Sequence, residues 1–289
     1  MHPASLAPRL LAPGFETRPA DGSVWMFEVP KLNPGAVAVL VAVSLALCVV
    51  SSAVAQGTPS AGRPGISELL LKWAPLVFKG FLFNLLVSVL AMSLGTLSGL
   101  ALGLGQLSLL SPIRRASWGI TQFFRNAPWL VLLFFAMLLL PFQLSIGGAT
   151  VPFPDWLKSV LGLSLPVMAN VSEIVRGGVK SIPVGQWESA EGLAFSRMQT
   201  LWRIILPQAI KRMLPPWMNL YAILTMATSL IAVVGVQDGL TMTRGALVAE
   251  NRVDLLMPMY FLLLSMFFLY CYPITRITRF LEHRFHVKA

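Results

Sequence analysis

Charged residues are scarce in this sequence. Of its 289 residues only 12% are Asp, Glu, Lys or Arg, whereas 56% are hydrophobic. Soluble domains carry about 25% charged residues, so a chain this poor in charge is expected to lie in a membrane. The formal net charge is +10, but a nucleic-acid-binding protein would cluster its Lys and Arg on a soluble domain, and no such domain is recognisable. Basic residues that flank membrane spans explain the charge better, and no nucleic-acid partner is predicted.

Signatures of common catalytic sites are also missing from the sequence. There is no G-x-x-x-x-G-K-[ST] loop to hold ATP phosphates, no H-E-x-x-H, no G-x-S-x-G and no pair of aspartates within an apolar run. The three histidines, His2, His283 and His286, all lie near the termini. The two cysteines, Cys48 and Cys271, lie in apolar runs and are expected to be small buried hydrophobes. The chain is therefore predicted not to be an enzyme, with no catalytic residue, metal site or cofactor of its own.

The N-terminal part of the sequence has two expected regions. Residues 1–35 are rich in Pro, Gly and Ala and are expected to form an irregular cytoplasmic arm. A charge-free run at 35–55 is long enough to cross a bilayer of about 30 Å. Ala53-Val54-Ala55 resembles a signal-peptidase site, but the segment before the run is far too long for a signal peptide. Residues 36–79 are therefore predicted to form an extra first transmembrane helix and a periplasmic connection, with a short interfacial helix at 66–79.

Five further apolar runs follow, and together they predict an all-α, polytopic membrane protein with about six transmembrane helices. Gly95, Gly99 and Gly103 recur every four residues, a spacing that lets membrane helices approach closely, and we expect them to pack within this chain. Lys and Arg are concentrated in the connections at 111–126 and 176–215 and in the tail at 276–289. The positive-inside rule then places both termini in the cytoplasm. The runs lie at residues 81–110, 127–142, 159–175, 216–236 and 255–272.

A polar segment between two of these runs predicts two short helices. Pro183 suits the first turn of one helix. Ser196 and Gln199 have the spacing of a capping box, so a second helix is expected to begin there. Pro207 is expected to end or kink the second helix, and Pro215-Pro216 to mark the entry to the next span. An apolar stripe on the second helix is predicted at Met198, Leu201, Trp202 and Ile205.

This polar segment resembles the "EAA" coupling loop of permease subunits in bacterial ABC importers, of the polar amino-acid branch. The family pattern of Glu-Ala-Ala, three residues, Gly and a later Leu-Pro corresponds to Glu188-Ser189-Ala190, then Ala194, then Leu206-Pro207. Ser replaces the first Ala and Ala replaces the Gly, so the surface stays small but the turn loses its most permissive residue. The runs at 173–179 and 124–131 are similar to the family as well. The resemblance covers roughly residues 80–285 and implies an importer transmembrane domain at 80–275, with the coupling loop at about 176–215.

The resemblance implies partners as well as a fold. Two ABC ATPase subunits, which hold ATP and Mg, would dock on the coupling loop. A second permease subunit, identical or different, and a periplasmic or extracellular solute-binding protein would complete the importer in the lipid of a bacterial inner membrane. The chain would carry a polar amino acid or an opine-like derivative into the cytoplasm by alternating access. The residues expected to dock the ATPase are Glu188, Ser189, Ala190, Ala194, Ser196, Arg197, Leu206 and Pro207.

Polar residues near the spans have two interpretations that the sequence leaves open. Each can form hydrogen bonds between helices or contact the substrate. Glu173 and Arg176 are spaced as an ion pair, which could close a helix end or form a gate. A stand-alone secondary transporter or channel for small polar solutes is the alternative function, but it would need coupling charges at the bilayer midplane. The candidates for the substrate pathway are Asn84, Asn170, Glu173, Thr225, Thr228 and Ser229.

Overall fold

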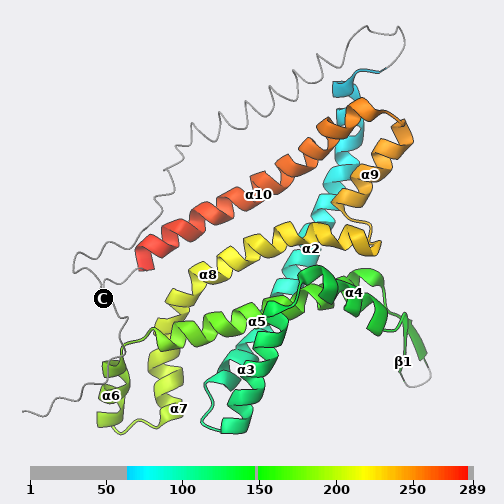
Figure 1. Cartoon of the computed structure of the whole chain (residues 1–289). Helices are drawn as coiled ribbons and strands as arrows, with labels where there is room; N and C mark the ends of the chain where they lie inside the picture. Colours follow the sequence, from blue (N-terminus) through cyan, green and yellow to red (C-terminus); the bar gives the residue numbers. More distant parts are fainter. Residues whose placement is uncertain (1–63, 147–148, 286–289) are drawn as a thin grey trace, which may run out of the picture. The chain divides into compact units, whose positions relative to one another are not determined.

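A computed structural model describes residues 64–146 and 149–285, and the predicted arm and first span lie outside this part of the chain. The described residues form helices, apart from one short hairpin, so the all-α prediction is confirmed (Figure 1). In chain order the elements are α2 (Ile66–Gln106), α3 (Ser111–Asn126), α4 (Trp129–Leu139), β1 (Gln143–Ile146), β2 (Ala149–Pro152), α5 (Asp155–Lys180), α6 (Val184–Gly192), α7 (Arg197–Thr200), a π-helical turn (Leu201–Ile205), α8 (Leu206–Ala227), a 3₁₀ segment (Thr228–Val234), α9 (Gly239–Glu250), a 3₁₀ turn (Val253–Leu255) and α10 (Leu256–Phe285).

Three helical stretches in the described part are long and apolar enough to cross a membrane: Ile66–Gln106, Arg197–Val234 and Val253–Glu282. The run predicted as a span at 127–142 forms only the 11-residue helix α4, about 16 Å long and too short for a bilayer. It joins α3 at a bend of 105°, and the pair together would make a fourth span. The run predicted as a span at 159–175 lies within α5, which is packed among the other helices and so tolerates polar residues.

α2 is one helix of 41 residues, so the separate interfacial helix predicted at 66–79 is wrong. A proline in a helix interior costs about 3 kcal/mol, yet the helix continues through Pro75. Packing offsets this cost, because Ile66, Leu69 and Val77 form a buried cluster with Leu255 of the following 3₁₀ turn and with residues of α9 and α10.

An ion pair ties the first turns of α2 to α9. Glu250 accepts hydrogen bonds from Lys72 Nζ at 2.7 Å and from Trp73 Nε1 at 2.8 Å. These two donors hold the pKa of Glu250 below its ordinary value. Glu250 therefore favours the folded state above its unfolded-state pKa, and this contribution is lost as the pH falls.

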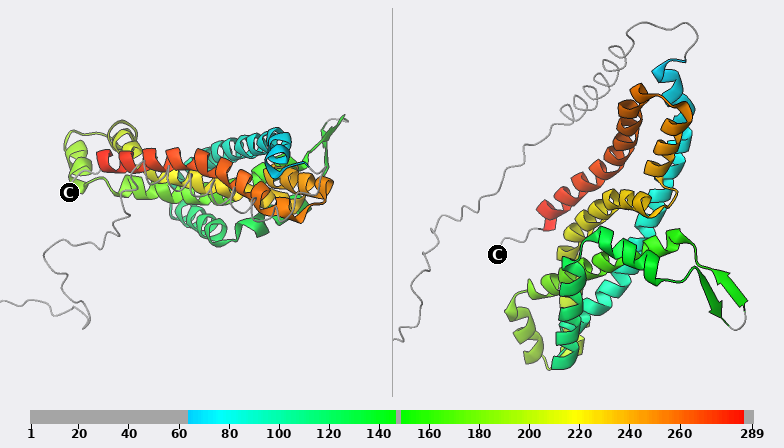
Figure 2. Two further views of the ribbon diagram at one scale, coloured as in Figure 1. Left: turned by 90° about the horizontal axis from the view of Figure 1, so that it is seen from above. Right: turned by 45° about the vertical axis from the view of Figure 1, so that its right-hand side comes forward.

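The α2–α5 contact is the most extensive between helices, and it depends on the glycine repeat. A Cβ atom on Gly99 would lie 2.7 Å from the carbonyl oxygen of Met168 and 2.7 Å from Cβ of Val171. Gly95 and Gly103 have the same relation to α5 through Val167 and Val175. The expectation that these glycines pack within the chain is confirmed. A second pair of neighbouring helices is α8 and α10, which lie side by side (Figure 2).

Pro207 was expected to end or kink the helix, and it does not end it, because the chain remains helical through this residue. The preceding five residues, Leu201–Ile205, form a π-helical turn in which the N–H of Leu206 donates to the carbonyl of Leu201. The wider turn leaves room for the Pro207 ring, which would clash with a carbonyl in a regular α-helix. Pro215 and Pro216 lie inside α8 and do not mark its start.

The turn between α6 and α7 has the geometry of a Schellman motif. The N–H of Phe195 donates to the carbonyl of Ala190 at 3.1 Å, and that of Ala194 to the carbonyl of Glu191 at 2.9 Å. Such a motif needs a left-handed residue, and Ala194 has φ +59°. The left-handed position coincides with the glycine of the coupling-loop pattern, so the predicted cost of alanine at this turn has a structural basis.

Gly99→Ala is expected to destabilise the fold by about 1–3 kcal/mol, because the new methyl group forces α2 and α5 apart. Gly119→Ala is the matched control, since a Cβ atom on this helical glycine meets no atom within 4 Å. Unfolding midpoints in mixed micelles measure both variants. Equal midpoints for the two would contradict the close contact.

Ala194→Gly is expected to stabilise the α6–α7 turn by about 1 kcal/mol, since glycine adopts the left-handed conformation without steric cost. Ala194→Val is expected to change stability in the opposite direction, because β-branched residues are strained at positive φ. Protease cleavage of the turn and thermal unfolding report the difference. A glycine variant cleaved faster than wild type would argue against strain at Ala194.

Candidate functional site

The α6–α7 segment presents an exposed polar surface. Glu188 and Ser189 are exposed, and Ala190 is buried beneath them. No salt bridge within the described part of the chain engages Glu188. A capping box begins α7, as predicted: the backbone N–H of Ser196 donates to Gln199 Oε1 at 2.9 Å, and that of Gln199 donates to Ser196 Oγ at 3.3 Å. The segment is therefore a rigid, exposed element with a carboxylate that has no ion-pair partner in the described chain.

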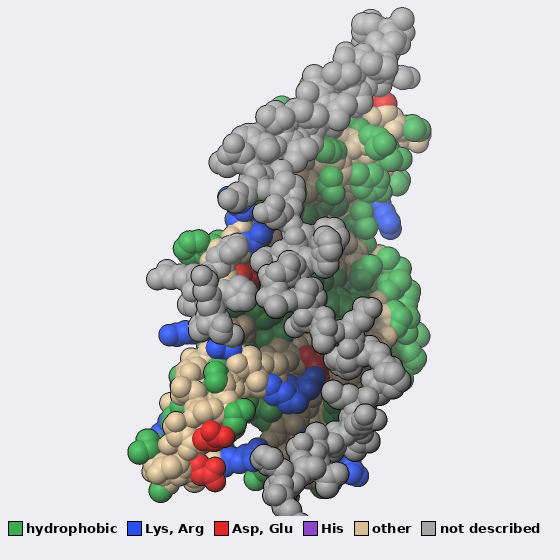
Figure 3. Space-filling view, turned by 60° about the vertical axis from the view of Figure 1, so that its left-hand side comes forward, with side chains coloured by type: hydrophobic (Ala, Val, Ile, Leu, Met, Phe, Trp, Pro, Cys, Tyr) green, Lys and Arg blue, Asp and Glu red, His purple; other side chains and the backbone are tan. Residues whose placement is uncertain are grey.

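The other residues expected at the docking surface lie on or beside this segment. Ala194 and Arg197 are exposed in the turn and the first position of α7. Leu206 is half-buried and Pro207 is exposed at the start of α8. In Figure 3, acidic and basic side chains gather at the end of the molecule where α6 and α7 lie.

The apolar stripe predicted on the second helix is split. Ile205 is fully buried, whereas Met198 and Trp202 have exposed fractions of 64% and 56%. Trp202 and Ile205 both lie in the π-helical turn, whose wider winding departs from the i, i+3, i+4, i+7 spacing of a regular helix face. Trp202 Nε1 donates a hydrogen bond to Met198 Sδ at 3.0 Å. These two side chains, with Val184 and Leu193, add apolar surface to the exposed segment.

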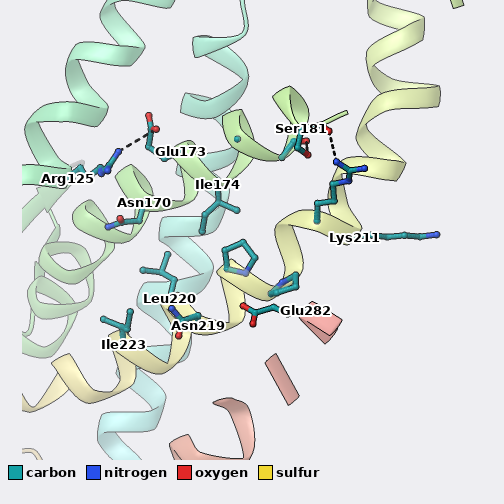
Figure 4. Close-up of a pocket in the computed structure, with 15 residues that line it drawn as sticks. Arg125, Asn170, Glu173, Ile174, Ser181, Lys211, Asn219, Leu220, Ile223 and Glu282 are labelled. Atoms are coloured by element: carbon teal, nitrogen blue, oxygen red, sulfur yellow. Dashed lines mark hydrogen bonds and ion pairs between the residues drawn. The ribbon is translucent and has the colours of Figure 1, made fainter. Parts of the chain in front are cut away.

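A cavity of about 710 Å³ lies between α5, α8 and the ends of α3 and α10. Asn170 and Glu173 line it from α5, as two of the predicted pathway residues. Figure 4 places Asn219 and Glu282 across the cavity from Arg125 and Glu173. Its lining is Arg125, Asn170, Glu173, Ile174, Gly177, Gly178, Ser181, Lys211, Arg212, Pro215, Pro216, Asn219, Leu220, Ile223 and Glu282.

Glu173 is the charged centre of one wall. It pairs with Arg176 at 2.5 Å, as the spacing predicts, and with Arg125 of α3 at 3.4 Å. The Arg125 contact joins the bend between α3 and α4 to α5, and no local spacing in the sequence predicts it. The amide nitrogen of Asn170 donates to the carbonyl of Pro166 at 2.8 Å. The cavity therefore offers carboxylates, cationic groups and amides within one space.

The remaining pathway candidates lie elsewhere. Thr225 and Thr228 are fully buried, and their hydroxyls donate to backbone carbonyls of α8 at 2.9 and 2.7 Å. Ser229 bonds to the carbonyl of Met226 at 2.9 Å. None of the three lines the cavity. In this structure the three hydroxyls bond to carbonyls of their own helical segments, and Thr228 Oγ1 also accepts a hydrogen bond from α2.

Asn84 belongs to a buried polar cluster that includes Asp238, which was not among the residues expected at a site from the sequence. The amide nitrogen of Asn84 donates to Thr228 Oγ1 at 3.1 Å and to Asp238 Oδ2 at 3.2 Å, and its oxygen accepts from the N–H of Gly239 at 2.8 Å. Asp238 is fully buried and caps α9 by accepting from the N–H of Thr241 at 2.8 Å. The Asp-Gly step before a helical run is a capping signal that could have revealed it.

Known proteins share both sequence and fold with this chain. Over 188 residues it is 30% identical to the inner membrane amino-acid ABC transporter permease protein YhdY of Escherichia coli K12, an alignment that covers 65% of this chain and 50% of YhdY. It is 36% identical over 172 residues to the probable amino-acid ABC transporter permease protein YckA of Bacillus subtilis 168, covering 60% of this chain and 74% of YckA. The chain thus spans only half the length of the first relative.

Solved structures match most of the described helices. The crystal structure of an amino acid ABC transporter with histidines superposes with a TM-score of 0.65 at 25% identity, over 74% of this chain and 96% of that one. The methionine ABC transporter MetNI in an inward-facing conformation matches with a TM-score of 0.55 at 18% identity, over 71% of this chain and 96% of that one, and supports the fold alone. The family described as "Binding-protein-dependent transport system inner membrane component" matches residues 91–287, well over half of the sequence, and the chain belongs to this family.

Proposed function

We propose that the chain is the membrane-spanning subunit of an ATP-driven importer that carries a polar amino acid, or an opine-like derivative, into the cytoplasm. The observation that carries this proposal is the α6–α7 segment. A capping box and a Schellman turn hold it rigid, and it exposes Glu188 at the position of the coupling glutamate in the family pattern. A solvated connection between spans would need neither feature.

The surface of this segment suits a protein partner. Val184, Leu193 and Met198 have exposed fractions of 68%, 72% and 64%, and they belong to the same α6–α7 segment as Glu188. Apolar side chains beside a charge are typical of an interface whose apolar core is surrounded by polar groups. The proposed partner is an ABC ATPase subunit that supplies ATP and Mg, present twice beside a pair of permease subunits. An external solute-binding protein would deliver the substrate.

Two contacts could carry motion to the cavity from the α6–α7 segment, which is the proposed docking segment. Gln208 Nε2 of α8 donates to Gln186 Oε1 of α6 at 3.3 Å. Arg212 Nη1 of α8 donates to the carbonyl of Ser181, at the end of α5, at 2.5 Å. Since α5 and α8 both line the cavity, a rigid movement of α6 and α7 would alter its walls. This is the proposed mechanical basis of alternating access.

The cavity supports an amino acid as the substrate. Its volume of about 710 Å³ falls within the roughly 300–1,000 Å³ of small-molecule sites. A zwitterion carries both an ammonium and a carboxylate, and the lining offers partners for each in Glu173, Glu282 and Arg125. The names of the relatives, which refer to amino acids, agree with this chemistry.

Glu188→Ala is expected to weaken ATPase association about tenfold or more, through loss of a charge-assisted contact. ATP-dependent amino-acid uptake into reconstituted vesicles should fall with it, and co-purification of the ATPase measures the association directly. Glu68→Ala is the control, because it removes an exposed carboxylate from the first turn of α2. If transport continues without any ATPase, the secondary-transporter alternative holds.

Glu173→Gln is expected to lower uptake about tenfold while ATPase co-purification stays at the wild-type level, because Glu173 lines the cavity and not the docking segment. The two variants thus separate substrate handling from coupling. Uptake and ATPase co-purification measured on the same preparations test this. Loss of co-purification in Glu173→Gln would mean that the cavity wall and the docking segment are one structural unit.

A further inference from the structure

A second cavity, of about 260 Å³, lies where the end of α2 meets the first turns of α3 and the last turns of α5. Four of its six lining side chains are cationic, and no carboxylate lines it. Its volume is below the roughly 300–1,000 Å³ of sites for drug-sized ligands, so it suits an ion or a small headgroup. The lining residues are Gln106, Arg114, Arg115, Trp118, Arg176 and Lys180.

The positive charge of this cavity is only partly compensated within the described chain. Arg176 pairs with Glu173. The ion pairs of the described residues do not include Arg114, Arg115 or Lys180. Arg114 Nη1 donates to the carbonyl of Ser108 at 3.2 Å, which leaves its charge in place. Like charges around one small space repel each other, and a bound anion would remove that repulsion.

Gln106 lines the cavity from the end of α2. Its side chain is nearly buried, with an exposed fraction of 5%. Its amide nitrogen donates to Thr121 Oγ1 at 2.9 Å and to Ser172 Oγ at 3.2 Å. Its oxygen, Oε1, is buried without a hydrogen-bond partner among the described residues. These contacts hold Gln106 at the wall of the cavity and leave the cations as the groups that a ligand would meet.

Apolar side chains are exposed on the same two helices. Ile113, Trp118 and Ile120 of α3 have exposed fractions of 45%, 55% and 43%. Leu97 and Leu100 are exposed on the turns of α2 that precede Gln106. Tryptophan and basic residues together are typical of the level at which lipid headgroups lie, and the excess of Lys and Arg assigns this level to the cytoplasmic face.

We propose that this cavity binds the headgroup of an anionic phospholipid. The phosphodiester would lie among Arg114, Arg115 and Lys180. The acyl chains would run along the exposed apolar residues of α2 and α3. Basic cavities between membrane helices on the cytoplasmic side bind anionic headgroups in this way. The site uses neither the docking segment nor the larger cavity, so it is independent of the function proposed above.

The first experiment measures lipid retention by the full chain, with native mass spectrometry after transfer from phosphatidylcholine bilayers that contain phosphatidylglycerol. Phosphatidylglycerol is expected to bind at least ten times more tightly than phosphatidylcholine. Arg115→Gln combined with Lys180→Gln should abolish this preference. The matched control is Lys79→Gln combined with Arg244→Gln, which removes two exposed cations that do not line the cavity and should keep the preference.

A second comparison tests the role of charge without any variant. Phosphatidylmethanol has the same net charge as phosphatidylglycerol, so wild type should also bind it more tightly than phosphatidylcholine. Equal binding of phosphatidylglycerol and phosphatidylcholine would overturn the proposal. Equal retention by wild type and the Arg115/Lys180 variant would also overturn it. Full displacement of the lipid by inorganic phosphate at millimolar concentration would replace it with a site for a free anion.

Discussion

The close contact between α2 and α5 is the constraint on which the rest of the described structure depends. Three glycines leave no α2 side chain at the contact, and the valines of α5 fill the space against the α2 backbone. Because a membrane offers little hydrophobic drive for helices to associate, such packing must supply the attraction. It fixes the depth and rotation of α5. That helix then lines both cavities and leads directly into α6.

Rigidity at the α6–α7 segment comes from short-range hydrogen bonds. The capping box satisfies the first amides of α7, and the Schellman turn satisfies the last carbonyls of α6. A strained Ala194 is kept in the left-handed region because these bonds on both sides outweigh its cost. The segment can therefore stand out from the helices as a defined surface, with exposed apolar and acidic side chains that a mobile loop would not hold in place.

Charges on α5 face two different spaces. Glu173 lines the larger cavity, whereas Arg176 and Lys180 line the smaller one. The ion pair between Glu173 and Arg176 thus connects a site of mixed charge with a purely cationic one. Arg125 approaches Glu173 from the bend between α3 and α4. Any movement of that bend would change the balance of charge in the larger cavity, because the carboxylate would then be shared between fewer cations.

The sequence itself set the membrane class through its composition. It also set three local features: the capping box at Ser196, the demand for a left-handed residue at 194 and the Glu173–Arg176 pair. Each of these involves residues a few positions apart, whose spacing determines their geometry. Only the tertiary structure decided that α2 continues through Pro75, that a π-helical turn accommodates Pro207 and that Asn84 meets Asp238. These outcomes depend on packing between residues far apart in the chain, which can outweigh local preference and leaves no mark in local spacing.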